Sequence, residues 1–349
     1  MCDPTIVVPG IMGSELYYNG SLCWPPVEEP RGDEKISIAA VTKLLAEANV
    51  KLARLARKGI TESGKIIPGC CFPLFFDGCG QRFASPEDKL LQSNISEQYV
   101  QSKKAGAYDT YLDACEYFHR RNGKIDIYFF GYDWRIDCND NAGRLEAFIE
   151  SVKKLSGCEA VNIVAHSMGC IIVGKYLKRC GGSTVRGVAT VGGPFLGSEY
   201  VKLFLNKCLD VEQFLKSSPI GDGLDIITST SPLISASVLP AIYRVAGRCK
   251  SLKNMLPSEC AEFAEEAAWD GLNHYNFAGT GTETLLICSR DIGGAASSDD
   301  RYGDGDGQVL VSSATAGGRF ENTKFYNMEH NELIFKEKCL QDIYDSLYN

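Results

Sequence analysis

The segment at residues 161–174 constrains the fold more than any other part of the chain. It reads VNIVAHSMGCIIVG: an apolar run of strand length, a short polar interruption and an apolar run that can form a helix. Ala165 and Gly169, two positions before and after Ser167, are both small. A sharp strand-to-helix turn that exposes a nucleophilic serine requires such residues, because larger side chains would collide there. The segment predicts a nucleophile elbow, although a serine that caps an ordinary helix is an alternative.

Apolar runs of strand length alternate with stretches of helix length along much of the chain. This alternation is typical of a parallel sheet whose two faces are covered by helices. We therefore expect an α/β fold built on such a sheet. The expected strands are residues 5–8, 125–130, 161–165, 187–191, 275–278 and, more weakly, 324–326, and the expected helices are 141–155 and 170–178.

Two long segments, residues 14–104 and 199–274, do not follow this alternation. We expect both to be insertions in a single domain over residues 1–349, because lids and binding loops often lie between sheet strands. In the first, residues 41–60 carry five lysines and arginines against one glutamate. A helix there could lie on an anionic bilayer or form a solvated face. In the second, many apolar residues could line a groove for a hydrocarbon chain or form the insertion's own core.

Ser167 needs a general base, because a serine hydroxyl is a weak nucleophile at neutral pH. The chain contains four histidines. In folds with a nucleophile elbow the chain order is serine, acid, histidine, which excludes His119 and His166. His274 directly precedes an expected strand, so no sheet-end loop with an acid lies between it and the serine. We therefore expect the base to be His330, which follows the last expected strand.

The glycine-rich loop YGDGDGQV at residues 302–309 offers two acids that could orient this histidine. Its glycines let the backbone turn a carboxylate back toward an imidazole. The apolar residues that follow favour Asp306, and Asp304 is the alternative. A calcium loop would need oxygen ligands where Tyr302 and Val311 stand, so we expect no metal site.

A tetrahedral intermediate also needs N–H donors for its oxyanion. We expect one from Met168, whose amide lies at the start of the helix after the elbow. We expect the second from Ile11 in the loop PGIMGS at residues 9–14, because the flanking glycines allow its amide to point at an oxyanion. A plain glycine-proline turn is the alternative explanation of this loop.

Composition disfavours several classes of protein. The formal net charge of -8 disfavours a nucleic-acid partner, since phosphate binding normally needs a basic face. No apolar run reaches the roughly 18 residues of a membrane span and the N-terminus lacks a signal-peptide pattern, so we expect a cytoplasmic or peripheral-membrane location. The fifteen cysteines include no C-x-x-C pair and favour reduced core thiols, with disulfides in an exported protein as the alternative.

Several motifs spread over nearly the whole chain occur in one order. The motifs are PGIMGS at 9–14, YDWR at 132–135, AHSMG at 165–169, GGPFLGS at 192–198, FAGTGTET at 277–284 and GDGDGQV at 303–309, followed by the late His330. Together they resemble the lecithin:cholesterol acyltransferase family, which includes lysosomal phospholipase A2-like enzymes. Ala165 stands where this family usually has glycine.

The resemblance implies an α/β-hydrolase fold, a mostly parallel sheet flanked by helices, with two inserted subdomains. It implies that the insertion at residues 14–104 engages a membrane surface and that the insertion at residues 199–274 caps an acyl-chain groove. The site residues that it implies are Ser167, Asp306 and His330 as a catalytic triad and the amides of Ile11 and Met168 as the oxyanion hole.

These residues predict a serine-dependent lipid acyl hydrolase or acyltransferase that forms an acyl-serine intermediate. We expect no cofactor, and the expected partner is a phospholipid or related lipid ester, with peripheral contact at a membrane surface. A soluble carboxylesterase for smaller esters and a lipid-binding protein without catalysis are the alternatives. Near the site, Asp133 and Arg135 are expected to form a structural ion pair beside Trp134, with a role in shaping the pocket as the alternative.

Overall fold

The computed structural model describes residues 3–14, 16–18, 21–24, 109–121, 126–206, 247, 249–260, 269–287 and 301–349. Within them, six strands form one sheet in the order β10-β7-β6-β5-β1-β4, and all neighbouring strands are parallel. This confirms the parallel sheet expected from the sequence. The strands are β1 (Thr5–Val8), β4 (Ile127–Phe129), β5 (Val161–His166), β6 (Val185–Val191), β7 (His274–Thr280) and β10 (Thr323–Asn327).

The position of a strand in the sheet explains how apolar its sequence is, and so how easily the strand is predicted. Every residue of the central strands β1 and β5 is buried, and most of these residues are apolar. Strand β10 lies at the edge of the sheet, and Lys324, Phe325 and Asn327 are exposed there. Its apolar pattern is correspondingly weak.

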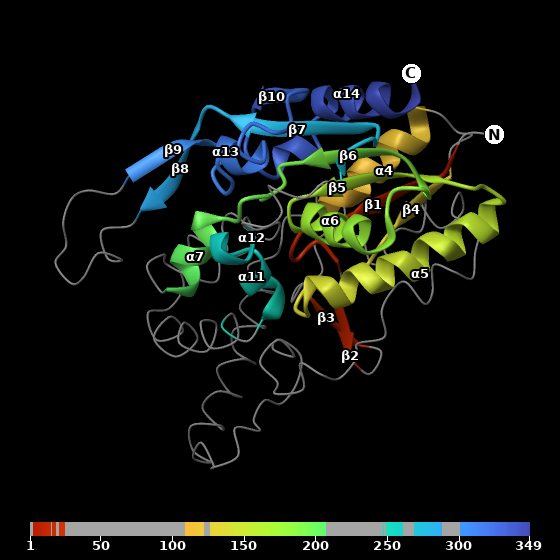
Figure 1. Ribbon diagram of the computed structural model, residues 1–349, viewed down its shortest axis with the longest axis horizontal. Coiled ribbons are helices and arrows are strands. Elements are labelled where there is room, and N and C mark those ends of the chain that lie inside the picture. Colours follow the sequence, from red (N-terminus) through yellow and green to blue (C-terminus); the bar gives the residue numbers. More distant parts are fainter. Residues whose placement is uncertain are drawn as a thin grey trace, which may run out of the picture.

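Two pairs of helices cover the sheet. One pair is α5 (Cys138–Ser156) and α6 (Met168–Cys180), which pack together and contact β5. The other pair is α4 (Asp109–Arg121) and α14 (Glu337–Tyr348), which pack together, with α4 on β4 and α14 on β6 and β7. Figure 1 shows the two pairs on opposite sides of the sheet. The sheet is therefore the middle of three layers.

Shorter elements lie beyond the carboxyl ends of the strands (Figure 1). They matter because functional sites of open parallel sheets form at that edge. These elements are α7 (Glu199–Leu205), α11 (Lys250–Asn254), α12 (Pro257–Cys260), α13 (Val311–Ala314), the 3-10 helix η6 (Glu332–Ile334) and the antiparallel pairs β2 (Leu16–Tyr18) with β3 (Ser21–Trp24) and β8 (Thr282–Ile287) with β9 (Arg301–Gly305).

The glycine-rich sequence at residues 302–309 is only partly a loop. Its first half belongs to β9, where Asp304 pairs with Glu283 and Gly305 with Thr282 of β8. A Cβ atom on Gly305 would lie 2.3 Å from the carbonyl oxygen of Val309. Glycine is therefore needed here for close approach of two backbone segments, which the sequence alone does not distinguish from a flexible turn.

Most of the two expected insertions lies outside the described residues, including the basic stretch at residues 41–60. The insertion at 14–104 and the insertion at 199–274 therefore remain predictions. In the described part of the second, Leu203 and Phe204 are buried in the main hydrophobic core and do not line a groove. These two side chains therefore belong to the core of the sheet and its helices, which neither expectation for this segment described.

Eight cysteines whose side chains the structure describes form no disulfide. Five thiols, those of Cys115, Cys138, Cys170, Cys260 and Cys339, have their pKa raised by burial. Such thiols pack as small apolar groups. Within the residues that the structure describes, no helix has both the length and the apolar character needed to cross a membrane.

Candidate active site

Ser167 lies at the turn between β5 and α6, as the sequence predicts. Its backbone angles are φ 54° and ψ -127°, an unusual conformation for a residue that is not glycine. Its N–H donates to the carbonyl oxygen of Val191 in β6, 2.9 Å away. A Cβ atom on Gly169 would lie 2.5 Å from the carbonyl oxygen of Val8. The tight elbow is thus held between two neighbouring strands, and residue 169 has no room for a side chain.

Ala165 is the other small residue of the elbow, and the packing there accommodates its methyl side chain. Ala165 is fully buried, between Val8 of β1 and Thr190 of β6. The usual glycine of the family pattern is therefore not required by this packing.

The loop that follows β1 passes directly beside the serine. Gly13 N donates to the Gly10 carbonyl oxygen at 3.2 Å, and Met12 has φ 63°. These features define a tight turn with a left-handed third residue. A Cβ atom on Gly10 would lie 2.8 Å from Cβ of Ser167, so the approach of the loop to the serine requires glycine. Ile11, the residue after Gly10, lines the pocket in front of Ser167.

A buried tyrosine holds this loop from the side of the sheet. The hydroxyl of Tyr132 donates to the carbonyl oxygen of Pro9 at 2.6 Å. Burial raises the pKa of Tyr132 well above its usual value, so the hydroxyl stays protonated and available as a donor.

Asp306 and His330 are in direct contact, although they come from different loops. Oδ2 of Asp306 lies 2.7 Å from Nδ1 of His330, and both side chains are buried. The other carboxylate oxygen accepts the amides of Gln308 at 3.0 Å and Val309 at 2.7 Å. The backbone N–H of His330 also donates to the carbonyl oxygen of Asp306 at 2.9 Å. The acid is fixed by its own turn and, in turn, fixes the imidazole.

Asp304, the alternative acid, does not contact the histidine. Its carboxylate accepts the hydroxyl of Thr280 at 2.6 Å and the amide of Gly281 at 2.7 Å. These two hydrogen bonds hold the pKa of Asp304 below its usual value. Asp304 therefore stabilises the β7–β8 turn. Of the two acids, only Asp306 contacts His330.

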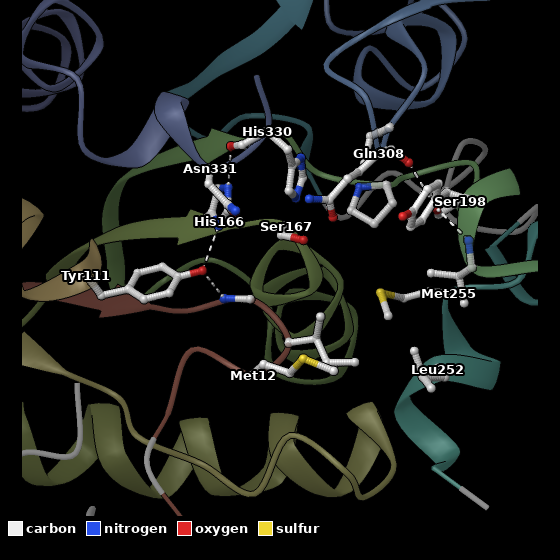
Figure 2. A pocket seen from close by; sticks show the side chains of 16 residues that line it. Met12, Tyr111, His166, Ser167, Ser198, Leu252, Met255, Gln308, His330 and Asn331 are labelled. Carbon is white, nitrogen blue, oxygen red and sulfur yellow. Dashed lines mark hydrogen bonds between the residues drawn. The ribbon is translucent and has the colours of Figure 1, made fainter. Parts of the chain in front are cut away.

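Ser167 and His330 face the same pocket. Figure 2 shows the His330 ring above Ser167. Nε2 of His330 is buried and has no hydrogen-bond partner among the described residues. The serine hydroxyl and the imidazole are therefore not joined in this structure. Serine–histidine hydrogen bonds are often long without substrate and tighten when a substrate binds.

Met168 is the first residue of α6, with its side chain fully buried. Its amide lies at the positive end of the dipole of this helix. Ile11 and Met168, the two residues expected to form an oxyanion hole, thus flank Ser167 from the loop side and from the helix side.

The pocket in front of Ser167 is narrow and mainly apolar, with a cavity volume of about 40 Å³. Two of its walls come from the segment expected to be a cap: Tyr200 and Val201 from α7, and Leu252 and Met255 from α11 and its carboxyl end. The remaining lining residues are Gly10, Ile11, Met12, Tyr111, His166, Pro194, Ser198, Gln308, Val309, His330 and Asn331.

Sequence reasoning missed one side chain of this pocket. Tyr111 lies on α4 and belongs to none of the motifs. Its hydroxyl lies 2.8 Å from the amide nitrogen of Gly10 and 2.7 Å from Nδ1 of His166 (Figure 2). The polar His166 at the end of a largely apolar strand was the sign that the strand end needed a buried polar partner.

The expected ion pair next to the site is confirmed. Arg135 donates from Nε to Oδ1 of Asp133 at 2.8 Å and from Nη2 to Oδ2 at 2.7 Å. Both side chains are buried, as is Trp134 between them in the sequence. Two parallel hydrogen bonds of this kind fix the geometry of the pair.

The chain matches a known family over most of the site. A sequence model of lecithin:cholesterol acyltransferase matches residues 91–326, more than half of the chain. The chain belongs to this family. The match includes Ser167 and Asp306, whereas His330 and the loop of Ile11 lie outside it. A relative with a shorter match is the uncharacterized protein YJR098C of Saccharomyces cerevisiae, 34% identical over 74 residues, which are 21% of this chain and 11% of the yeast protein.

Two solved structures are similar to this family member. A chain of the Tle4–Tli4 complex is similar over 99% of this chain and 98% of its own, with a TM-score of 0.50 and 15% identity. The mature lipase BlEst2 of Bacillus licheniformis is similar over 67% of this chain and 83% of its own, with a TM-score of 0.44 and 15% identity. The fold is that of the α/β-hydrolases.

Proposed function

We propose that this protein is a serine-dependent acyl hydrolase or acyltransferase that acts on lipid esters. The observation that carries the proposal is the buried contact between Asp306 and His330, with the free Nε2 of the imidazole facing the pocket of Ser167. Membership of the lecithin:cholesterol acyltransferase family supports a lipid ester as the substrate class.

In the first step Nε2 of His330 takes the proton of the Ser167 hydroxyl while Oγ attacks the ester carbonyl carbon. The carbonyl oxygen gains a negative charge, and the amides of Ile11 and Met168 donate hydrogen bonds to it. The bond from the carbonyl carbon to the leaving oxygen then breaks. The leaving alcohol or lysolipid departs with the proton from His330, and the acyl group stays on Ser167.

In the second step His330 takes a proton from an incoming hydroxyl, which attacks the acyl-serine. With water the product is a free fatty acid, and with a lipid alcohol it is a new ester. In both cases the proton returns to Ser167 Oγ. Asp306 keeps its negative charge throughout and stabilises the imidazolium that forms in each step.

The small cavity favours a second candidate, a carboxylesterase for short esters. A volume of about 40 Å³ is small for an acyl chain. Hydrolysis of short soluble esters and of phospholipid vesicles should therefore be compared. A lipid enzyme will prefer the vesicles, whereas a carboxylesterase will prefer the soluble esters.

Labelling with a fluorophosphonate tests the serine mechanism directly. We expect the wild-type protein to be labelled and the Ser167→Ala variant to remain unlabelled. Ser151→Ala is the matched control, because Ser151 lies on the exposed side of α5, where its hydroxyl donates to the carbonyl of Ala147. Equal labelling of Ser167→Ala and the wild-type protein would exclude Ser167 as the nucleophile.

Product analysis separates hydrolysis from transfer. The protein is incubated with phospholipid and a long-chain alcohol, and the products are identified by mass spectrometry. Free fatty acid alone indicates a hydrolase, and an ester of the added alcohol indicates an acyltransferase. Either product must disappear with Ser167→Ala; a product that persists would contradict the proposal.

A further inference from the structure

We propose that Tyr111 is a positioning residue of the acyl-transfer site, which acts directly on the loop of Gly10 and, through His166, on the backbone of His330. The role rests on the proposed function, because it concerns the geometry of the same serine and base. Tyr111 belongs to α4, more than a hundred residues after Gly10 in the sequence.

A chain of hydrogen bonds connects the three segments that carry the reacting groups. The Tyr111 hydroxyl contacts Gly10 N at 2.8 Å and Nδ1 of His166 at 2.7 Å. On the other side of its ring, Nε2 of His166 lies 3.1 Å from the carbonyl oxygen of His330. Two side chains, Tyr111 and His166, thus join the loop of Gly10 to the loop of His330.

The donors and acceptors in this chain of hydrogen bonds can be assigned in only one consistent way. Burial holds the pKa of His166 well below its usual value, so the ring is neutral and carries one N–H. A carbonyl oxygen can only accept, so this N–H is on Nε2 and donates to His330. Nδ1 must then accept the Tyr111 hydroxyl proton, and the hydroxyl oxygen accepts the amide of Gly10. Burial also raises the pKa of Tyr111, so the phenol keeps its proton.

At one end, the chain of hydrogen bonds reaches Gly10, which lies beside Ser167. A Cβ atom on Gly10 would lie 2.8 Å from Cβ of Ser167, 3.3 Å from its Oγ and 3.1 Å from the Tyr111 hydroxyl oxygen. The phenol and the serine therefore flank the same glycine. Because Ile11 is the next residue, the direction of the Gly10 amide helps to set the direction of the amide expected to bind the oxyanion.

At the other end, the chain of hydrogen bonds contacts the backbone carbonyl of His330. The carbonyl of His330 accepts from His166, while its N–H donates to Asp306 and its ring contacts the Asp306 carboxylate. The rings of His166 and His330 are 4.8 Å apart. A proton on His166 would oppose the proton that His330 must accept, so a neutral His166 favours the basic role of His330.

The phenol ring and the phenol hydroxyl can be separated by mutation. The ring is buried, is 6.2 Å from the Phe129 ring, and would be 2.4 Å from a Cβ on Gly13. Tyr111→Phe keeps this ring and removes the hydroxyl alone. The Gly10 amide then loses its acceptor and Nδ1 of His166 loses its donor.

Kinetics with a soluble p-nitrophenyl ester test the positioning role. We expect Tyr111→Phe to lower kcat about tenfold with little change in KM, since small misplacements of reacting groups reduce the chemical step more than binding. Tyr117→Phe is the matched control, because Tyr117 lies on the same helix and donates to Oε1 of Gln341, away from the site. We expect its kcat to equal that of the wild-type protein.

Nitrogen NMR of ¹⁵N-histidine-labelled protein tests the hydrogen-bond chain without any assay of activity. With four histidines in the chain, each ring can be assigned by single substitutions. In the wild-type protein we expect His166 to be protonated on Nε2 and bare on Nδ1. Tyr111→Phe should shift the Nδ1 resonance, and Tyr117→Phe should not. A proton on Nδ1 of His166 in the wild-type protein would overturn the proposal, whether or not the variants fold.

The two measurements distinguish failure of this role from failure of the proposed function. A wild-type protein that hydrolyses no ester would overturn the proposed function, and with it the catalytic consequence of Tyr111. An active wild-type protein whose Tyr111→Phe variant keeps its full kcat would overturn the positioning role alone.

Discussion

Nδ1 of His330 and Oδ2 of Asp306 lie 2.7 Å apart in a position where neither side chain is exposed to solvent by more than 3%. The nitrogen belongs to a loop after the edge strand β10, and the oxygen to a turn after the β8–β9 hairpin. Only the carboxyl edge of the sheet brings the two loops together. The contact carries the proposed chemistry, and the most direct mutational test concerns it.

Replacing the acid should remove most of the activity. Asp306→Asn presents an amide N–H or a neutral oxygen to Nδ1 of His330, so the imidazole is neither oriented correctly nor stabilised when protonated. We expect kcat to fall by about 10³–10⁴, as for the same change in other serine triads. Asp304→Asn is the control and should keep kcat within about twofold while lowering the melting temperature, because it weakens the β7–β8 turn. A larger loss of kcat in the control would reassign the acid.

Two helical glycines should respond in opposite ways to the addition of one methyl group. In Gly169→Ala the Cβ atom would lie 2.5 Å from the backbone oxygen of Val8, and we expect a loss of about 1–3 kcal/mol in the free energy of unfolding. In Gly143→Ala the nearest atom is the flexible end of Arg179 at 3.2 Å. We expect that variant to gain up to about 1 kcal/mol, since alanine favours helices over glycine.

Urea unfolding of both glycine variants measures these free energies, and fluorophosphonate labelling reports on the elbow. Reduced labelling should accompany Gly169→Ala alone. If Gly169→Ala proved as stable as Gly143→Ala, the close packing of the elbow against β1 would be wrong.

The buried ion pair should matter more than an exposed one. Arg135→Met leaves the Asp133 carboxylate buried without this partner, and we expect a loss of about 3–5 kcal/mol in the free energy of unfolding. Arg186→Met breaks an ion pair with Asp3 in which the arginine side chain is 61% exposed. We expect at most about 1 kcal/mol there. Chemical denaturation of the two variants under the same conditions compares them, and equal losses would contradict the structural role of Asp133 and Arg135.

Mild acid should destabilise the fold through two buried histidines. Burial lowers the pKa of His274 to about 4, and that of His166 well below its usual value. The unfolded chain binds these protons below about pH 6.5 whereas the native protein does not, so stability falls as the pH decreases from about 6.5 toward 4. Each histidine contributes a slope of at most about 1.4 kcal/mol per pH unit.

Urea unfolding between pH 7.5 and pH 4.5 measures the acid effect. His274→Gln removes one of the two groups without touching the candidate active site, since His274 contacts Thr190 at the amino end of β7. We expect the variant to show a shallower dependence on pH. An unchanged slope would mean that His274 is protonated in the native protein.

The amino-acid sequence by itself predicted the parallel sheet and the elbow, and it singled out His330 as the candidate base. Central strands are buried on both faces, so their apolar runs are visible without a structure, and small residues on both sides of Ser167 have a steric meaning in any context. Two helices were harder to read from the sequence. Helices α4 and α14 were not expected, because α4 comes soon after the long segment that did not follow the alternation and α14 follows the last expected strand.

Only the tertiary structure decided between Asp306 and Asp304 and brought Tyr111 to the site. Asp304 lies within β9, opposite Glu283, and its carboxylate accepts from Thr280 and Gly281. Asp306 lies just beyond the end of β9, and its carboxylate contacts His330. Tyr111 contacts Gly10 and His166 from a helix that lies 101 residues after Gly10 in the sequence. Sequence patterns report the local preferences of the backbone and its apolar faces, whereas contacts between remote side chains depend on how the sheet and its helices pack.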